Sequence, residues 1–470
     1  MHEITHYGFL IINMCNTQDG RAAHFLENYW NRYILNNKKY TVKYPFLNNN
    51  LFKYYPISIN SMITKPNFSQ AALTVLESRY LARDENGNIK ETPEQMFWRV
   101  AWNIACAEVI YKFNINKRPT DSSFYEEIEK DPEKKSLVEE WAKKFYNAMI
   151  SFDFLPNSPT LMNAGCKLQQ LSACFVLPIE DSIGDEHSEN AIFDTVKNVS
   201  IIHKTGGGTG MSFSRCRQKG AIVRSTGMRA SGPISWLKVI DGATEAIKQG
   251  GKRRGANMGI LSVHHPDIED FIRCKEKEGD IHNFNISVAL TNKFMEALEN
   301  GEDYDIIEPH TGRVIGKKNA MNIMRLIAHH AWLNGEPGII FIDRMNLPET
   351  NITPSLGQIE STNPCGEVPL LPYESCNLAS INVANFVTKD KKIDWNRLKE
   401  TINLVTRFMD DVIDMNNYPL SKIEKMTKGN RKIGIGVMGW ADMLVLLGIP
   451  YNSDEALELA EVLMEFISYY

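Results

Sequence analysis

The hydrophobic and polar positions between residues 92 and 151 predict helices. Thr92, Pro93 and Gln95 stand ahead of an apolar stretch at residues 96–111, in the order of an N-cap, a first-turn proline and a capping-box glutamine. A second helix is predicted over residues 134–151. We therefore expect a mainly helical domain, which we bound at residues 69–152.

After residue 153 the pattern is mixed. Short apolar runs that are typical of strands, at residues 174–177, 338–342 and 379–383, stand between predicted helices at 189–204, 232–248, 319–334 and 394–415. Strands that alternate with helices favour an α/β arrangement with parallel pairing. We expect an α/β unit over residues 153–470, whereas residues 1–68 show no clear period and receive no assignment.

Composition narrows the class of protein. With 43% hydrophobic and 23% charged residues, the 470-residue chain is typical of a folded globular protein. Its net charge of -5 gives no broad basic surface, so polymeric nucleic acid is not an expected partner. No apolar stretch suits a bilayer and the N-terminus lacks a secretion-signal pattern, so we expect a cytoplasmic protein without a membrane partner.

The 8 cysteines are sparse and irregularly spaced, which excludes a disulfide framework. There is no Cys-x-x-Cys pair, and no set of cysteines and histidines has zinc spacing, so no metal site is predicted. Any redox-active cysteines must then be brought together by the fold.

One cysteine stands in a stiff loop at residues 361–367. Pro364 fixes its own backbone and pushes Asn363 out of the helical region, while the glycine after the cysteine permits a tight reversal. If the backbone is near-extended, Asn363, Cys365 and Glu367 project to one side.

A carboxylate beside a thiol raises the thiol pKa, which is the opposite of what a thiolate nucleophile or a metal ligand needs. The arrangement suits hydrogen-atom transfer, in which Cys365 as a radical takes a hydrogen from carbon while Glu367 takes a proton from an adjacent hydroxyl. Taken alone, the motif fits an ordinary Pro-Gly turn with a buried cysteine equally well.

Two more cysteines are candidates for a dithiol. Cys174 stands at the entry of an apolar strand-like run, and Cys376 follows shortly after the Cys365 loop. Two-electron reduction of a substrate needs thiols that can close to a disulfide, with Cα atoms within roughly 7 Å. Taken singly, each fits a packed core cysteine better.

Two glycine-rich runs carry further candidates. The run at residues 204–210 follows a predicted helix, and its spacing matches neither a dinucleotide fingerprint nor a phosphate-binding loop. Its glycines would let the backbone approach a ligand closely, and a flexible turn explains them equally well. The run at residues 248–257 adds cations suited to a polyphosphate or a nucleobase edge, with a solvated basic loop as the alternative.

Together these segments resemble ribonucleotide reductase, and within that family they are most similar to the adenosylcobalamin-dependent class II. The resemblance runs from about residue 73 to residue 448, and the joint order of its motifs is highly specific. The motifs lie at residues 157–165, 171–174, 206–210, 213–215, 249–259, 363–367, 374–377 and 434–442.

The resemblance implies a ten-stranded α/β barrel, incomplete in this chain, with a finger loop. On that loop Cys365 would be the thiyl radical that abstracts the 3′-hydrogen of a ribonucleotide. Glu367 would be the base at the 3′-hydroxyl, and Asn363 would orient the ribose. Cys174 and Cys376 would supply the reducing electrons, with one of them protonating the departing 2′-hydroxyl.

The resemblance also implies binding sites and a homodimer, because the effector site of the family lies at a dimer interface. The residues expected to line the substrate pocket are Ser158, the backbone near Ala173, Gly206, Gly207 and Gly208. The residues expected to serve an effector, a deoxynucleoside triphosphate or ATP, are Asp181 and Arg224, with Gln249, Arg253 and Arg254 on a relaying loop.

Family members continue past residue 470 with further barrel strands, a phosphate-gripping loop and a cysteine-bearing tail. We therefore expect a fragment, or one half of a split protein with a separate C-terminal half, that acts on a ribonucleoside di- or triphosphate with a thioredoxin- or glutaredoxin-type reductant. Two alternatives stay open. One is a class I large subunit that uses a metal-containing radical partner, and the other is a nucleotide-binding regulatory or assembly chain that catalyses nothing.

Overall fold

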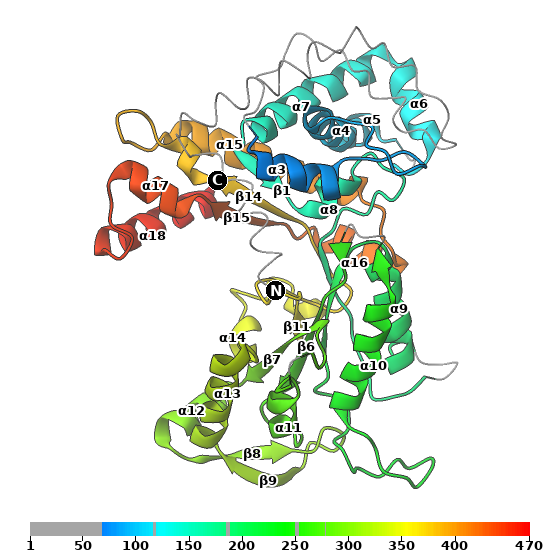
Figure 1. Ribbon diagram of the computed structural model, residues 1–470, viewed down its shortest axis with the longest axis vertical. Helices are drawn as coiled ribbons and strands as arrows, with labels where there is room; N and C mark the ends of the chain where they lie inside the picture. The colour runs from blue at the N-terminus through cyan, green and yellow to red at the C-terminus, as the bar shows by residue number, and fades with distance from the viewer. Residues whose placement is uncertain (1–67, 116–118, 185–188, 250–252, 278) are drawn as a thin grey trace.

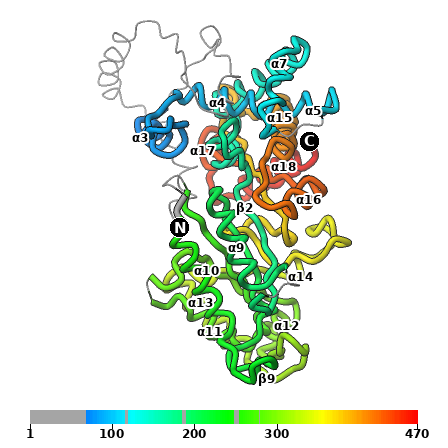
Figure 2. Tube along the Cα trace, turned by 90° about the vertical axis from the view of Figure 1, so that its right-hand side faces the viewer, coloured from blue at the N-terminus to red at the C-terminus, as the bar shows by residue number. Residues whose placement is uncertain are grey.

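The computed structural model describes residues 68–115, 119–184, 189–249, 253–277 and 279–470, so the unassigned N-terminal segment lies almost entirely outside the described residues. The helices of residues 70–163 gather at one end of the long axis, and the larger sheet lies with its own helices toward the other end (Figure 1). A view turned by 90° shows the same separation (Figure 2).

The helical end begins as the sequence predicts. Thr92 Oγ1 accepts a hydrogen bond from the Gln95 amide at 3.3 Å, and Gln95 Oε1 accepts one from the Thr92 amide at 2.8 Å, which completes a capping box. The predicted helix at residues 96–111 is divided at Cys106, whose amide bonds back to Asn103 in a tighter turn. The helices are α3 (Gln70–Val75), π-helix η4 (Leu76–Tyr80), α4 (Pro93–Ala105), α5 (Ala107–Phe113), α6 (Ser122–Lys130), α7 (Pro132–Ile150) and α8 (Ser158–Asn163).

A long helix, α15 (Trp395–Met415), closes the core of this end. The ring of Phe408 on α15 meets Phe145 of α7 and Phe154 edge-on, with centroids 5.1 and 5.3 Å away. Such aromatic contacts add to the apolar burial that holds the helices together.

The larger sheet has the order β10-β7-β6-β3-β2-β13, in which the first five strands are parallel and β13 is antiparallel. Helices connect the parallel strands, so the predicted α/β class with parallel pairing is confirmed. The strands are β2 (Cys174–Val176), β3 (Gly208–Ser212), β6 (Asn257–Ser262), β7 (Phe284–Leu290), β10 (Gly338–Phe341) and β13 (Ser375–Cys376). The connecting helices are α9 (Ile192–Lys204), α10 (Pro233–Ala246), α11 (Ile268–Arg273), α12 (Asn292–Asn300) and α13 (Ala320–Asn334).

Alternate residues of these strands point to opposite faces of the sheet, and each face has its own apolar cluster. Phe175, Met211 and Leu261 point to the helices and join a large apolar cluster with them. Met258 and Ala289 point to the opposite, inner face and join a small separate cluster. The inner face is the one that holds the candidate site.

A second sheet, ordered β1-β14-β15, connects the two ends. The described residues form these two open sheets and short hairpins rather than a closed ring of ten strands, in keeping with the incomplete barrel expected. The remaining strands are β1 (Phe154–Pro156), β14 (Leu378–Asn382), β15 (Gly434–Met438), β4 (Lys248–Gln249), β5 (Arg253–Arg254), β8 (Asp303–Ile307) and β9 (Val314–Asn319). The remaining helices are α14 (Ile342–Met345), α16 (Ser421–Asn430), α17 (Trp440–Leu447), α18 (Asp454–Tyr469) and the 3-10 turns Pro354–Leu356 and Val383–Phe386.

The loop with Cys365 is framed by β11 (Ser361–Thr362) and β12 (Pro369–Leu370), which pair antiparallel. It lies against the inner face of β3, where two glycines leave room for it. A Cβ atom on Gly208 would lie 2.7 Å from Pro364 Cγ, and one on Gly210 would lie 1.7 Å from the Thr362 carbonyl oxygen. Any side chain at these positions would displace the loop.

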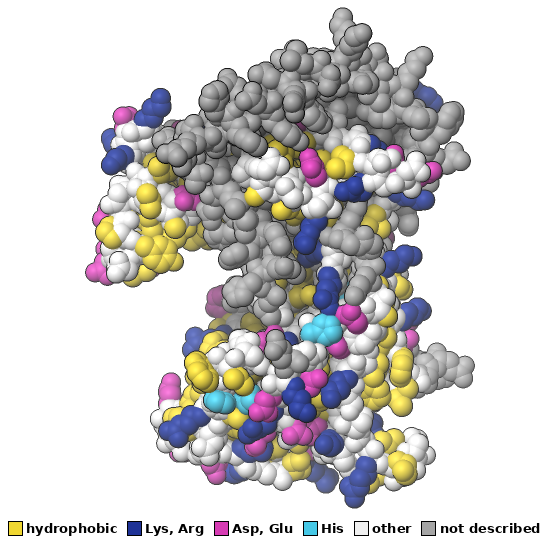
Figure 3. Space-filling model, in the orientation of Figure 1, with side chains coloured by type: hydrophobic (Ala, Val, Ile, Leu, Met, Phe, Trp, Pro, Cys, Tyr) yellow, Lys and Arg dark blue, Asp and Glu magenta, His cyan; other side chains and the backbone are white. Residues whose placement is uncertain are grey.

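The surface carries mixed charge over the sheet end, while apolar side chains gather over α17 and α18 (Figure 3). Among the latter, Val445 and Leu457 are 78% and 70% exposed. Within the described residues, no helix is both long enough and apolar enough to cross a membrane.

Replacing Gly210 by alanine is expected to unseat the loop, because the new Cβ would overlap the Thr362 carbonyl. Gly242→Ala on the exposed side of α10 is the control: its Cβ would meet no atom within 4 Å, and it should stabilise the protein by about 0.5–1 kcal/mol. Thermal unfolding should show a lower midpoint for Gly210→Ala only. A Gly210→Ala midpoint equal to that of the wild type would contradict the packing.

Candidate active site

Two of the predicted cysteines face each other on neighbouring strands. Cys174 on β2 and Cys376 on β13 are directly paired in antiparallel register. Directly opposed residues have Cα atoms roughly 4.5–5.5 Å apart, inside the roughly 4.4–6.8 Å range of disulfides. Both are buried free thiols. The pair therefore meets the spatial requirement for closing a disulfide.

The two thiols of this pair differ in acidity. Cys376 donates a hydrogen bond to Cys174, and this bond lowers the Cys174 pKa although burial opposes it. The charge of Arg253 and the amide of Asn363, whose Nδ2 lies 3.8 Å from the Cys174 sulfur, act in the same direction. The bond to Cys174, together with burial, raises the pKa of Cys376 well above its ordinary value. Cys174 is therefore the sulfur that ionises first, and Cys376 keeps its proton.

The loop of Cys365 is a tight turn, which corrects the near-extended backbone considered from the sequence. The Gly366 amide donates to the Asn363 carbonyl at 3.1 Å, and Gly366 has a φ of 88°, where glycine is unstrained. Asn363 Oδ1 accepts from two loop amides at 3.1 and 3.0 Å. The Asn363 side chain is consequently buried toward Cys174, whereas Cys365 and Glu367 are exposed.

Cys365 holds its proton firmly. Although the side chain reaches the surface of the described residues, the surrounding atoms desolvate the sulfur, and the negative charges of Glu367 and Cys174 add to this effect. Together they raise the pKa of Cys365 to about 12, against the smaller opposing effect of Arg253. The thiol is therefore neutral at physiological pH.

The side chain of Arg253 connects the β4–β5 hairpin to the backbone beside Cys174. One guanidinium nitrogen donates to the carbonyls of Ala173 at 3.1 Å and Gly206 at 2.7 Å. Ser158, which was also predicted to line the pocket, is the first residue of α8. Its hydroxyl oxygen lies 2.8 Å from that of Tyr80. Arg253 thus binds backbone carbonyls predicted to line the pocket, and its charge acts on the nearby sulfurs.

The three predicted pocket glycines have three different surroundings. Gly206 offers its carbonyl to Arg253. A Cβ on Gly207 would lie 2.4 Å from the Phe175 ring, so this residue serves the core between sheet and helix. Gly208 makes room for Pro364 of the loop. Close packing within the protein, rather than a flexible turn, therefore explains the last two.

Known protein families match almost all of the described chain. Residues 66–169 match the family model described as ribonucleotide reductase, all-alpha domain, and residues 172–470 match the one described as ribonucleotide reductase, barrel domain. The chain belongs to the ribonucleotide reductase family.

Individual reductases agree with the family assignment. A vitamin B12-dependent ribonucleoside-diphosphate reductase of Thermoplasma acidophilum is 48% identical over 84% of this chain and 55% of its own length. A reductase of the same name from Mycobacterium tuberculosis is 42% identical over 85% of this chain and 53% of its own length. A ribonucleoside-diphosphate reductase subunit alpha of Chlamydia pneumoniae is 28% identical over 97% and 43%. The chain thus spans about half the length of these reductases.

The residues expected to serve an effector lie on several segments of this chain, with residues 249 and 253 directly paired on the β4–β5 hairpin. Asp181 binds Arg217, with Nε at 2.6 Å, and also His310. Arg224 lies exposed in a turn closed by the bridge between Ile222 and Arg229. The backbone of residue 249 lies on β4, but its side chain is outside the described residues.

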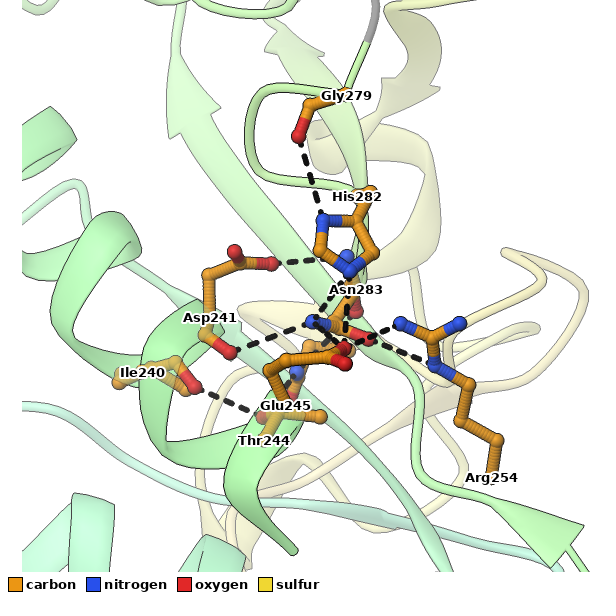
Figure 4. A network of polar contacts seen from close by, with 9 residues as sticks. Ile240, Asp241, Thr244, Glu245, Arg254, Gly279, His282 and Asn283 are labelled. Atoms are coloured by element: carbon orange, nitrogen blue, oxygen red, sulfur yellow. Dashed lines mark hydrogen bonds and ion pairs between the residues drawn. The ribbon is translucent and has the colours of Figure 1, made fainter. Parts of the chain in front are cut away.

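Arg254 belongs to a separate polar network beside the C-terminal end of α10 (Figure 4). Its guanidinium donates to Glu245 at 2.6 Å and to the side-chain oxygen of Asn283 at 2.9 Å. His282 Nε2 lies 3.0 Å from the same Glu245 oxygen. Neighbouring arginines therefore point to different places: Arg253 binds the carbonyls of Ala173 and Gly206, and Arg254 anchors the hairpin to α10.

One residue at the site was missed by sequence reasoning. Asn285 on β7 donates from Nδ2 to the Pro364 carbonyl at 2.5 Å. A signal was present, because Asn285 and Ser287 are polar residues at alternate positions of an otherwise apolar strand. Only the fold shows that this polar side faces the loop.

Mild oxidation of the native protein is expected to join Cys174 to Cys376 and to leave Cys365 free, because only the first two are directly opposed. Peptide mapping without reduction identifies the bond. Cys376→Ser should abolish it, and Cys166→Ser, outside this site, should not. A bond formed by residue 365 in the wild type would contradict the arrangement.

Glu367→Gln should make Cys365 react faster with iodoacetamide at mildly alkaline pH. Losing the negative charge lowers the thiol pKa, and only the thiolate reacts. Below the pKa, the thiolate fraction rises roughly tenfold for each unit by which the pKa falls. Mass spectrometry of the peptide measures the rate, with Glu360→Gln as control, since Glu360 pairs with Arg215 instead. Identical rates in Glu367→Gln and wild type would refute the electrostatic coupling.

Proposed function

We propose that this protein reduces ribonucleotides to 2′-deoxyribonucleotides by a thiyl-radical mechanism. The observation that carries the proposal is one neutral, exposed thiol at a loop tip, Cys365, beside a directly paired buried dithiol, Cys174 and Cys376. Family membership gives this geometry its chemical context.

A neutral thiol suits hydrogen-atom transfer, because the S–H bond supplies or receives a hydrogen atom without forming a thiolate. In the proposed reaction the sulfur of Cys365, as a radical, takes the 3′-hydrogen of the ribose and returns it at the end. Glu367 accepts the proton of the 3′-hydroxyl and returns it when the 3′-hydrogen is restored. The exposure of both side chains supports access of a ribose from the inner face.

The dithiol supplies two electrons and two protons. The C2′–OH bond breaks, the oxygen leaves as water, and a C2′–H bond forms while the sulfurs of Cys174 and Cys376 join in a disulfide. The bond from Cys376 to Cys174 already makes one sulfur the electron-rich partner and the other the proton donor. Asn363 donates a hydrogen bond to the Cys174 sulfur, and it would orient the ribose relative to this sulfur.

The radical source that we propose is adenosylcobalamin. The matched reductases with the higher identities are named vitamin B12-dependent, which favours this source over a metal-containing partner subunit. The residues fit such a group in one respect: Cys365 alone of the three thiols is exposed, so an external radical generator can reach it. Adenosylcobalamin would supply a carbon-centred radical that takes the thiol hydrogen.

We also propose a substrate, a reductant, an effector and a division into domains. The substrate would be a ribonucleoside diphosphate, as in the names of the relatives, with a thioredoxin- or glutaredoxin-type protein renewing the dithiol. A deoxynucleoside triphosphate or ATP would act as effector on a homodimer. We also propose a helical domain over residues 69–152 and a catalytic unit from residue 153 onward.

Cys365→Ser is expected to abolish deoxyribonucleotide formation, because serine cannot carry the radical. The assay uses the protein with any further segment that its coding region encodes, adenosylcobalamin, a dithiol reductant and a ribonucleoside diphosphate. Cys166→Ser should retain activity. Turnover by the Cys365→Ser variant would overturn the radical assignment, and absence of turnover in the wild type would overturn the proposed function.

A further inference from the structure

The tip of the Cys365 loop is tied to the sheet by one side chain of β7. Asn285 Nδ2 donates to the carbonyl oxygen of Pro364 at 2.5 Å. This carbonyl belongs to the peptide unit that joins Pro364 to Cys365, and a peptide unit is planar. Fixing the oxygen therefore fixes the plane from which the Cα of Cys365 projects its side chain.

The chemistry of the contact explains why an asparagine stands there. A carbonyl oxygen needs a donor, and the side-chain amide of asparagine supplies one. Asn285 is directly paired with Met258 of β6, whose Cε lies 3.9 Å from the position of a Cβ on Gly366. Two adjacent strands thus approach the loop on either side of Cys365, one through a hydrogen bond and one through the methyl end of a methionine.

The loop has little else to hold its tip. Within the described residues, the other hydrogen bonds of residues 363–368 are formed inside the loop or with the frame that carries it, apart from the contact of Asn363 with the Cys174 sulfur. Pro364 also rests on Gly208, but a van der Waals contact sets no direction for a peptide plane. Asn285 is therefore the directional link between the Pro364–Cys365 peptide unit and the sheet.

We propose that Asn285 is a positioning residue for the thiol of Cys365, acting through the Pro364 carbonyl to hold the sulfur at the place where it meets the ribose. The proposal rests on the proposed reductase function for its catalytic consequence, but its structural consequence can be measured without turnover. Asn285 itself touches no reacting atom.

The test compares Asn285→Ala and Asn285→Asp with the wild type. Aspartate keeps the size of asparagine but, when ionised, has no donor and places a charge beside the carbonyl. Both variants should lose roughly 100-fold in kcat with little change in KM, as expected for a reacting atom displaced by about 1 Å.

A second readout is the pH profile of Cys365 alkylation. Asn285→Ala should release the tip toward solvent, remove part of the desolvation that raises the thiol pKa, and shift the profile to lower pH. Formation of the Cys174–Cys376 disulfide and the thermal midpoint should stay as in the wild type. Asn334→Ala is the control, because Asn334 makes a comparable amide bond to the Lys275 carbonyl, away from the loop.

The outcomes separate this proposal from the proposed function. Wild-type alkylation profiles in both Asn285 variants would overturn the positioning role, whether or not the protein turns over. Unchanged kcat in both variants of an active enzyme would overturn it as well. A shifted profile in a protein without reductase activity would support the positioning of Cys365 and contradict the function instead.

Discussion

The arrangement depends on two glycines on the inner face of β3. Gly208 and Gly210 leave a surface flat enough for the loop of residues 361–368 to lie against it, with Pro364 and the Thr362 carbonyl in the space that Cβ atoms would fill. A strand normally presents side chains on both faces, and a glycine in a strand weakens it. Here that cost is offset because the loop itself completes the packing of the inner face.

Placing the loop there gives chemically identical thiols different properties. Cys174 lies beside donors and a cation, which lower its pKa, whereas Cys376 donates to it and keeps its proton. Cys365, at the tip, is desolvated and faces negative charge. The site therefore contains one sulfur with a lowered pKa and two with raised pKa values, and this division matches a reaction that needs both a reducing pair and a hydrogen-atom carrier.

Local sequence patterns predicted the features that depend on neighbours in the chain. The capping box at Thr92, the helix that became α7 and the parallel strands that include β2 and β10 follow from such patterns. The reversal at Gly366 was predicted as well. The family resemblance brought the three cysteines into one hypothesis, which spacing alone could not do.

Other features depend on partners far away in the chain and could not be predicted. Asn363 turns inward because Cys174 lies beneath it, 189 positions away. Arg253 and Arg254 are adjacent in sequence, yet one binds carbonyls near the sulfurs and the other binds Glu245. The role of Asn285 could not be predicted, because it depends on the contact of β7 with the Pro364 carbonyl of the loop.

The most direct measurement is an experimental structure of the reduced protein, with sulfur atoms located by their anomalous scattering. We expect the sulfurs of residues 174, 365 and 376 to form one cluster on the inner face of the sheet, with the Pro364 carbonyl against β7. A sulfur of residue 365 found on the outside of the sheet, away from the other two, would contradict it.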